Sequence, residues 1–299
     1  MNELQLGTAN PLLREPPIRD VSDTALWVAS YRAMESERPD ALFKDPYARR
    51  MAGKRGEDIV ASIPWGKSMA WSIIVRTVVM DEVILRCIEN GAQVVLNLGA
   101  GLDTRAFRLR LPRALRWIDV DLPAMTAYRR SFLNSKLAPC RHAHVEADLS
   151  DCASRSHVLE EARSAGGPLL VITEGLLIYL TAEQVGGLAK QLRAEGQAHW
   201  WVADLITPIL RQTMRMIWYS QLGDAGALFK FAPQDSRKFF EAVGWQENEF
   251  HSTWSESIRL ERPAPQGRAW DRLWKWSSPA AQEALRRMSG VALLGPTVV

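Results

Sequence analysis

The 299-residue sequence has few cysteines, no dense run of one charge and no long apolar stretch. Its three cysteines form no CxxC pair, which excludes a disulfide scaffold and fits a reducing compartment. The first 17 residues lack a basic end followed by an apolar core, so the sequence predicts no signal peptide. No uncharged apolar run approaches the roughly 20 residues that span a bilayer. We therefore expect a soluble, cytoplasmic protein without a membrane partner.

An excess of one charge is also lacking, because 37 Lys and Arg residues against 34 Asp and Glu residues leave a net charge of +3. Without a dense basic tract, this balance predicts no nucleic-acid partner. With 47% hydrophobic and 24% charged residues, the composition is that of a globular chain with a sizeable core. The marked excess is in tryptophan, with 12 Trp against 5 Tyr and 8 Phe, which indicates heavy use of aromatic packing.

Local patterns divide the chain into an arm and one long domain. Residues 1–21 are Pro-rich and aperiodic, which predicts a flexible arm. Residues 22–91 carry apolar side chains at helical spacing, which predicts a helical cap. Between 92 and 204, short apolar runs alternate with helical segments, as in a mostly parallel sheet covered by helices on both sides. The expected strands are 94–98, 116–121, 142–147, 169–173 and 198–204.

After residue 204 the alternation loosens. Residues 205–232 contain a helical insertion, and residues 233–299 contain further helices and strands of what we treat as the same domain, 22–299. Because binding preferences usually reside in such irregular segments, the insertion is expected on the substrate side. The strand-like pieces there are 245–250, 257–260 and 291–294.

The strongest local signal is the turn Gly99-Ala100-Gly101 at the end of the first expected strand. Two glycines let the backbone turn tightly and approach a ligand closely. Twenty residues later, Asp121 ends the second expected strand, where a carboxylate can accept hydrogen bonds from both ribose hydroxyls. Asp119, two residues earlier on the same face, is the rival, but the ligand should lie beyond the strand's end. The pattern predicts a nucleoside site at the carboxyl edge of the sheet.

The turn lacks the features that bind phosphate. A dinucleotide fingerprint requires a third glycine where this sequence has Thr104, and the Gly-Lys-Ser/Thr ending of a triphosphate loop is absent. Asp103 follows the turn instead of a lysine. A nucleoside ligand without phosphate, such as S-adenosylmethionine, suits this pattern, whereas a tight strand-to-helix turn without any ligand is the alternative.

Six segments in a fixed order extend the pattern over positions 22 to 250, of which Asp45-Pro46-Tyr47 and Gly101-Leu102-Asp103-Thr104-Arg105 are the more specific. With these segments the sequence resembles the leucine carboxyl methyltransferase family of class I S-adenosylmethionine-dependent enzymes, including its bacterial O-methyltransferase branch associated with polyketides. The resemblance implies an α/β fold: a doubly wound, mostly parallel, seven-stranded Rossmann-like sheet with an N-terminal helical cap. Residues 92–204 would then be the cofactor-binding core. The segments are 24–33, 43–48, 98–105, 117–123, 147–149 and 173–180.

The resemblance also implies roles for cap residues. Two basic residues, Arg32 and Arg76, would hold the carboxylate of the cofactor's methionine part, since a guanidinium grips a carboxylate with two parallel hydrogen bonds. The alternative for Arg32 is a surface residue among Glu35 and Arg38. Arg76 has apolar neighbours, so a buried partner is expected for it.

Further roles fall on the core. The turn 99–101 would lie under the methionine and ribose, with Asp121 on the ribose. Asp148 and the Leu149 backbone would contact the adenine, although Asp148 could instead cap the following helix. Glu174 would meet the cofactor's ammonium group, and Tyr179 would shape the same pocket.

Methyl transfer from a sulfonium requires alignment of the acceptor more than activation. No motif places a histidine as general base, and His199 is expected to be packed in its strand. We therefore expect no catalytic base; Glu174 and Tyr179 are the candidates near the methyl group. This favours a carboxylate acceptor on a small molecule or natural product, which is ionised at neutral pH, over a phenol on a polyketide-like scaffold, which needs a base. A non-catalytic interaction protein with this fold is the third possibility.

Two further patterns carry expectations. Cys140, His142, His144 and Glu146 alternate along one expected strand, which could hold a metal, but we expect an edge strand with polar side chains in solvent and no metal. Some of the tryptophans of the cap and insertion, Trp65, Trp71 and Trp218, are expected to line an apolar pocket for an acceptor with hydrophobic or aromatic bulk.

Overall fold

The computed structural model describes residues 21–63, 66–222, 229–265, 267, 269, 272 and 276–297. The expected arm therefore lies outside the described residues except for its last position. None of the helices that are described is long and apolar enough to cross a membrane.

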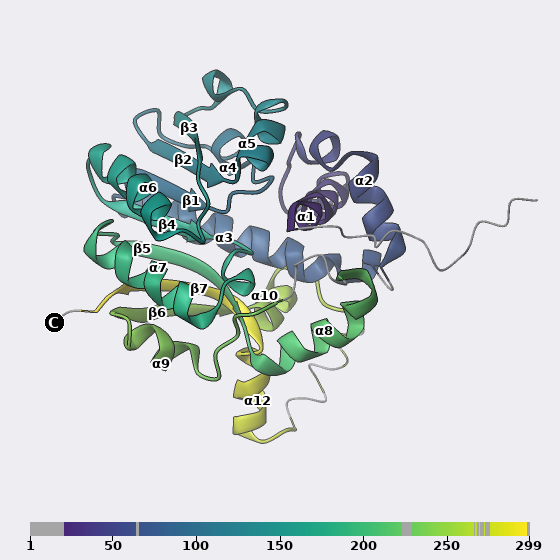
Figure 1. The fold of residues 1–299 in the computed structure, drawn as a ribbon. Helices are drawn as coiled ribbons and strands as arrows, with labels where there is room; N and C mark the ends of the chain where they lie inside the picture. The colour runs from purple at the N-terminus through teal and green to yellow at the C-terminus, as the bar shows by residue number, and fades with distance from the viewer. Residues whose placement is uncertain are drawn as a thin grey trace, which may run out of the picture.

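A seven-stranded sheet forms the centre of the molecule, with the strand order β3-β2-β1-β4-β5-β7-β6 (Figure 1). Strands β1 to β5 are parallel, and β7 is antiparallel to both β5 and β6. The predicted mostly parallel, seven-stranded sheet is confirmed. The strands are β1 (Val94–Leu98), β2 (Arg116–Asp121), β3 (Arg141–Glu146), β4 (Leu169–Thr173), β5 (Trp200–Ile206), β6 (Trp245–Ser252) and β7 (Ser289–Pro296).

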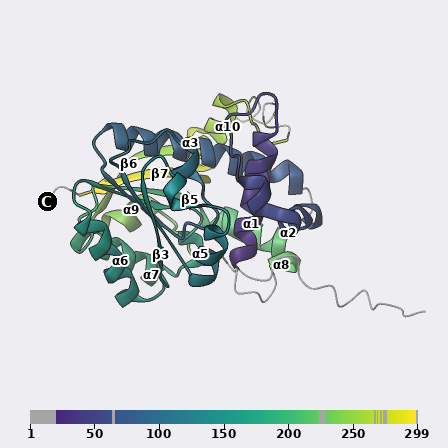
Figure 2. The same ribbon diagram turned by 90° about the horizontal axis from the view of Figure 1, so that it is seen from above.

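Helices cover both faces of the sheet, as the turned view shows (Figure 2). One face packs against α6 (Cys152–Ser164), α7 (Ala182–Ala194) and α9 (Ser236–Glu241). The other packs against α3 (Ala70–Glu89) and the end of α10 (Thr253–Arg259). The remaining helices are α1 (Val21–Ser36), α2 (Ala48–Ser62), η2 (Gly66–Met69), α4 (Arg105–Arg108), α5 (Pro123–Arg130), η3 (Ser135–Leu137), η4 (Leu177–Tyr179), α8 (Pro208–Leu222) and α12 (Pro279–Arg286).

Several helices begin where the sequence offers a cap. A capping box opens α7, with the Thr181 side chain accepting from Gln184 N–H and the Gln184 side chain accepting from Thr181 N–H. The Asp235 side chain caps α9 by accepting from Lys238 N–H, and Pro123 is the first residue of α5. These signals are local, so the sequence alone is enough to place them.

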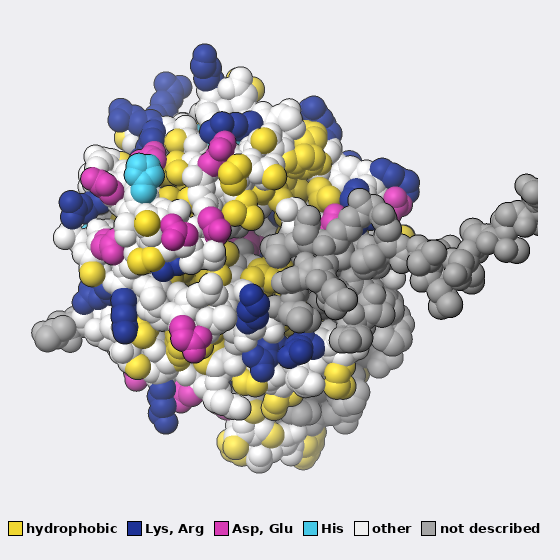
Figure 3. All heavy atoms as spheres, in the orientation of Figure 1, with side chains coloured by type: hydrophobic (Ala, Val, Ile, Leu, Met, Phe, Trp, Pro, Cys, Tyr) yellow, Lys and Arg dark blue, Asp and Glu magenta, His cyan; other side chains and the backbone are white. Residues whose placement is uncertain are grey.

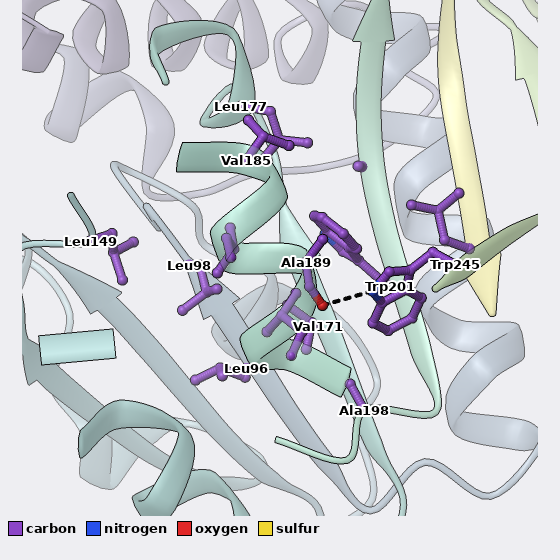
Figure 4. Packing of buried hydrophobic residues seen from close by; sticks show 14 of the residues in the cluster. Leu96, Leu98, Leu149, Val171, Leu177, Val185, Ala189, Ala198, Trp201 and Trp245 are labelled. Carbon is purple, nitrogen blue, oxygen red and sulfur yellow. Dashed lines mark hydrogen bonds between the residues drawn. The ribbon is translucent and has the colours of Figure 1, made fainter. Parts of the chain in front are cut away.

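Tryptophan fills the core between the sheet and its helices. The indoles of Trp201 and Trp245 are fully buried and meet edge to face, with ring centroids 5.3 Å apart. The Trp245 indole N–H donates to the Ala189 carbonyl of α7 at 2.9 Å (Figure 4). Trp201 makes a second edge contact with Phe240 of α9. The Trp201 indole N–H donates to Thr173 Oγ1 of β4 at 2.9 Å, so both of these large side chains are buried without an unpaired donor.

Helices α1 and α2 pack together beyond one end of the sheet (Figures 1 and 2). Helix α2 does not end at Gly53, where the sequence suggests a stop; it is kinked there, because Gly53 has φ 55° and ψ −170° inside the helix. The expected strand at 257–260 is also wrong, because these residues form the last turn and the C-terminal cap of α10. The Ser252 side chain caps the start of this helix by accepting from Ser255 N–H. A capping serine therefore outweighs the short alternating pattern.

Candidate functional site

A cavity of about 340 Å³ opens at the carboxyl ends of β1, β2, β4 and β5, and side chains of α1, α3 and α8 close it from the cap side. Every residue predicted from the sequence for the cofactor or the methyl group lines this one cavity. These residues are Arg32, Arg76, Gly99, Ala100, Gly101, Asp121, Asp148, Leu149, Glu174 and Tyr179.

The glycine turn follows β1 directly and lines the cavity next to Asp121 at the end of β2. Gly99 and Gly101 have φ angles of 65° and 48°, in the left-handed region that glycine adopts without steric cost. Gly101 N–H donates to Asp121 Oδ2 at 2.6 Å, and Leu122 N–H donates to Asp121 Oδ1 at 2.8 Å. Burial raises the pKa of Asp121 above its ordinary value, although these two N–H groups oppose the rise. The Asp121 carboxylate is therefore fixed by backbone at the edge of the cavity.

Asp119, the rival for the ribose, is buried and does not line the cavity. Its Oδ1 accepts from Asn97 Nδ2 and Trp117 Nε1, both at 2.8 Å, and its Oδ2 accepts from Arg129. Asp119 thus neutralises a buried arginine, and only Asp121 faces the space where a ribose could bind.

Asp148 is exposed at the rim of the cavity. Its Oδ1 accepts from both the N–H and the hydroxyl of Ser150, at 2.8 and 2.7 Å. The alternative that Asp148 caps the next helix is wrong, because Asp151 caps α6 by accepting from Ser154 N–H. The backbone carbonyl of the neighbouring Leu149 accepts from Arg155 Nη1 at 2.8 Å, which holds this segment against α6.

Arg76 is the centre of an ion-pair network inside the cavity. Its Nε donates to Glu174 Oε1 at 3.0 Å and its Nη1 donates to Asp204 Oδ2 at 2.7 Å. Arg105 binds the other Glu174 oxygen and also pairs with Asp81 and Asp103. Burial raises the pKa of Glu174, but the guanidiniums of Arg105 and Arg76 outweigh burial and hold that pKa below its ordinary value. Glu174 is therefore an anion and not a proton donor at neutral pH.

Arg32 is buried at 6% exposure, so the surface alternative for this residue is wrong. Its Nε donates to Asp45 Oδ2 at 2.9 Å and its Nη2 donates to the Leu102 carbonyl of the glycine turn. Within the described residues, Arg32 Nη1 and Arg76 Nη2 have no acceptor at hydrogen-bonding distance. Each guanidinium on the cavity wall thus keeps one nitrogen available for an anionic ligand group.

The cap end of the cavity is apolar and aromatic. The rings of Tyr179 and Phe229 lie 5.8 Å apart, and the Tyr179 hydroxyl donates to the Thr24 hydroxyl of α1 at 3.2 Å. Burial raises the pKa of Tyr179, so its hydroxyl is a neutral donor. The other apolar residues of this end are Trp27, Val28, Ile73, Ile178, Ile206 and Met214.

Of the three tryptophans considered for the acceptor pocket, the structure describes the side chain of Trp71 alone. Trp71 does not line the cavity, because its side chain packs with the α3 side of the sheet. Trp65 and the side chain of Trp218 lie outside the described residues. Trp27 of α1, which the sequence analysis did not single out, lines the cavity instead.

The polar side chains of the predicted edge strand are not all in solvent. β3 is an edge strand, yet His142 is fully buried, with Nε2 2.7 Å from Asp119 Oδ2 and Nδ1 2.9 Å from Ser135 Oγ. His144 also has both ring nitrogens buried, whereas Glu146 is exposed. Asp119, His142 and His144 lie close enough to share a metal ion, but the contacts of Asp119 and His142 already use the lone pairs that a metal would need.

Some residues of the site were missed from the sequence. Asp204 stands at the end region of β5 much as Asp121 stands at the end of β2, so the same rule could have found it. Asp103 and Arg105 lie in the segment used for the family resemblance, but no local pattern shows that Arg105 pairs with both Asp103 and Glu174. None of the five histidines, all of which are described, lines the cavity.

Comparison with known proteins finds a matching family model and relatives named as methyltransferases. Residues 25–193 match the family model of leucine carboxyl methyltransferases. A protein of Streptomyces coelicolor named as an S-adenosyl-L-methionine-dependent methyltransferase is 37% identical over 172 residues, which are 54% of this chain and 60% of that protein. A protein of Frankia alni with the same kind of name is 31% identical over 245 residues, 76% of this chain and 83% of that protein.

Two solved structures share the fold at low sequence identity. A DUF574 family protein of Streptomyces avermitilis has a TM-score of 0.59 at 14% identity and covers 92% of this chain and 97% of its own. A protein of Thermobifida fusca named as a methyltransferase has a TM-score of 0.58 at 16% identity and covers 94% and 96%. The matched model covers more than half of the chain and the sheet is the predicted seven-stranded, mostly parallel one, so this protein belongs to the leucine carboxyl methyltransferase family and has the class I methyltransferase fold.

Proposed function

We propose that this protein is an S-adenosylmethionine-dependent O-methyltransferase that forms a methyl ester on the carboxylate of a small molecule with hydrophobic or aromatic bulk. The observation that carries the proposal is a single cavity with a polar, charged end at the glycine turn and an apolar, aromatic end at the cap. No histidine lines it, which supports an acceptor that needs no base.

The polar end fits the cofactor in charge and in hydrogen-bonding capacity. Arg32 Nη1 and Arg76 Nη2 are available for the carboxylate of its methionine part, and Glu174 supplies a negative charge for its ammonium group. Asp121 would accept from the ribose hydroxyls, and Asp148 would accept from the adenine amine at the rim of the cavity.

When bound, S-adenosylmethionine supplies a methyl group on a sulfonium, which is electrophilic without further activation. The residues of the chain then need to align the acceptor and exclude water. The apolar wall of Trp27, Phe229 and Met214 would exclude water, and the ring of Tyr179, which lies beside Phe229, would shape the same end of the cavity. None of these steps requires a proton to be removed by the protein.

Electrostatics near the methyl group also favours an anionic acceptor over a phenol. Glu174 and Asp204 both line the cavity and are both paired with Arg76, which reduces their repulsion of an approaching carboxylate. The guanidiniums of Arg105 and Arg76 lower the pKa of Glu174, so this carboxylate is a weak proton acceptor, which disfavours a phenol that needs a base. On the face drawn in Figure 3, acidic and basic side chains are intermingled, so a small molecule suits the site better than a nucleic acid.

Two measurements test the proposal. Isothermal titration calorimetry should detect binding of S-adenosylmethionine and of S-adenosylhomocysteine; absence of both would favour a non-catalytic interaction protein. With methyl-labelled cofactor and a panel of aromatic and aliphatic acids, the labelled product should release labelled methanol in mild alkali. A labelled product that survives alkali would contradict the ester and indicate a phenolic ether instead.

A further inference from the structure

Arg129 of α5 lies directly behind the glycine turn, on the side away from the cavity. It is 1% exposed and does not line the cavity, so it cannot touch a ligand there. Its Nη1 donates to the carbonyls of Gly101 at 2.9 Å and Asp103 at 2.7 Å, and lies 3.3 Å from the carbonyl of Ala100. Its Nη2 pairs with Asp119. One guanidinium therefore gathers three carbonyl oxygens of the turn.

The fourth carbonyl of this segment is held by a second arginine. The Leu102 carbonyl accepts from Arg32 Nη2, and Arg32 is anchored in turn by Asp45. Every carbonyl oxygen from Ala100 to Asp103 thus accepts from an arginine. The Gly101 N–H donates to Asp121 Oδ2, so the turn is held by two arginines through its carbonyls and by Asp121 through this N–H.

Stability alone does not explain a buried Arg129. A buried ion pair often contributes no more to folding than apolar side chains of similar volume would. Arg129 also leaves its Nε buried and without a partner among the described residues, which has a cost. A residue with these costs that occupies three carbonyls of one turn acts by fixing the geometry of that turn.

We propose that Arg129 is a positioning residue for cofactor binding: it holds the glycine turn in its binding conformation through the carbonyls of Ala100, Gly101 and Asp103. Asp119 takes part by orienting and neutralising Arg129, and His142 and Asn97 orient Asp119. This inference rests on the proposed role of the turn in binding the cofactor, and it adds a residue that lies outside the cavity.

The test compares the affinity of the full chain for S-adenosylhomocysteine by isothermal titration calorimetry, at a temperature where circular dichroism shows every variant folded. Arg129→Met keeps length and apolar volume but removes all donors, and its affinity should fall by about tenfold or more. Arg129→Lys keeps the positive charge opposite Asp119, but a single ammonium cannot reproduce the planar set of donors of a guanidinium. Its affinity should therefore lie between those of the unchanged protein and Arg129→Met.

Arg287→Met is the matched control. Arg287 is also mostly buried and paired with a carboxylate, Glu247, but it stacks on Phe250 far from the cavity. Its loss should leave the affinity within about twofold of the original chain, because only its local pairing is removed. Amide hydrogen exchange of the unliganded protein gives a second readout. Compared with the unchanged protein, the amides of residues 99–105 should exchange faster in Arg129→Met and at the same rate in Arg287→Met.

The outcomes separate the two proposals. If the unchanged protein fails to bind S-adenosylhomocysteine, the proposed function is wrong. If it binds but Arg129→Met binds equally well, or Arg287→Met loses as much affinity, the positioning role is wrong. Should Arg129→Met fail to fold, Arg129→Lys decides: a loss of about threefold or more supports the role, and affinity equal to the original overturns it.

Discussion

At the scale of single residues, His144 shows how burial sets ionisation on an edge strand. Both of its ring nitrogens are buried and unpaired among the described residues. Burial, assisted by the positive charge of Arg129, lowers the pKa of His144 from 6.5 to about 4. The folded protein therefore keeps this ring neutral at pH values where an unfolded chain would protonate it.

We expect a histidine resonance that disappears in His144→Gln to titrate near pH 4 in NMR spectra. Because the folded pKa lies below the unfolded one, the contribution of His144 to stability is complete above pH 6.5 and is lost as the pH falls toward 4. His251 is the internal control, since hydrogen bonds to Glu256 and Glu249 raise its pKa, so it should titrate above 6.5. Titration of His144 at or above 6.5 would contradict the burial argument.

Two carboxylates of β2 show what the sequence could decide at this scale. Asp119 and Asp121 share one face, and the rule that ligands bind beyond the strand end selected Asp121, which does face the cavity. The partner of Asp119 could not be predicted, because Arg129 lies on the next helix and its direction depends on packing. The roles of both residues toward a ligand stay predictions until binding is measured.

At the scale of elements, the kink of α2 depends on one glycine. Gly53 has φ 55° and ψ −170°, a backbone region that is nearly restricted to glycine. A Cβ at this position would meet no atom within 4 Å, so a substitution there tests backbone strain without a steric clash.

Gly53→Ala should lower the free energy of unfolding by about 1–3 kcal/mol in urea denaturation. Gly186→Ala is the matched control, because Gly186 lies inside α7 and its added Cβ would make an ordinary contact 3.8 Å from Val243. That change should raise stability by about 0.5–1 kcal/mol, since alanine favours helix. Effects of the same sign in both variants would refute the interpretation.

Elements with local signals were predictable, and elements that depend on pairing were less so. The expected strands 94–98 and 169–173 match β1 and β4 to the residue, because both are short apolar runs bounded by turn residues. The helix at 253–259 was missed, because a short alternating pattern fits a strand as well as an exposed helix.

At the scale of the whole molecule, Arg262 ties the segment after α10 to the cap. Its Nη2 donates to Glu35 Oε1 at 2.9 Å and also to the Asp40 carbonyl, and Glu35 is fully buried. Glu35 Oε1 also accepts a hydrogen bond from Leu42 N–H at 2.8 Å, which fixes the loop after α1. Residues 227 positions apart thus share one buried ion pair.

Arg262→Met should lower the free energy of unfolding by about 3–5 kcal/mol, because it removes the buried cation of Glu35 and leaves this carboxylate only the half-exposed Arg38, 3.6 Å away. Arg259→Met, which removes an exposed guanidinium paired with Glu82, should cost no more than about 1 kcal/mol. Chemical denaturation of both variants in parallel measures the contrast. Equal losses would mean that burial does not set the strength of the Arg262 pair.

Long-range pairing marks the limit of prediction at this scale. The predicted site residues do meet in one cavity, because the parallel topology brings the carboxyl ends of β1, β2 and β4 together. Which side chains pair there could not be predicted: Arg76 and Asp204 are 128 positions apart, and only the packing of α3 against β5 brings them into contact.

The position of β7 between β5 and β6 has a consequence for how the chain folds during synthesis. β5 ends at Ile206, but β7, which pairs with one of its edges, consists of residues 289–296 and is therefore synthesised much later. Until then β5 presents an unpaired apolar edge, which is a template for pairing with other chains. The parallel half of the sheet can form first, so the newly made protein depends on protection of this edge, by chaperones or by rapid completion, until its last strand arrives.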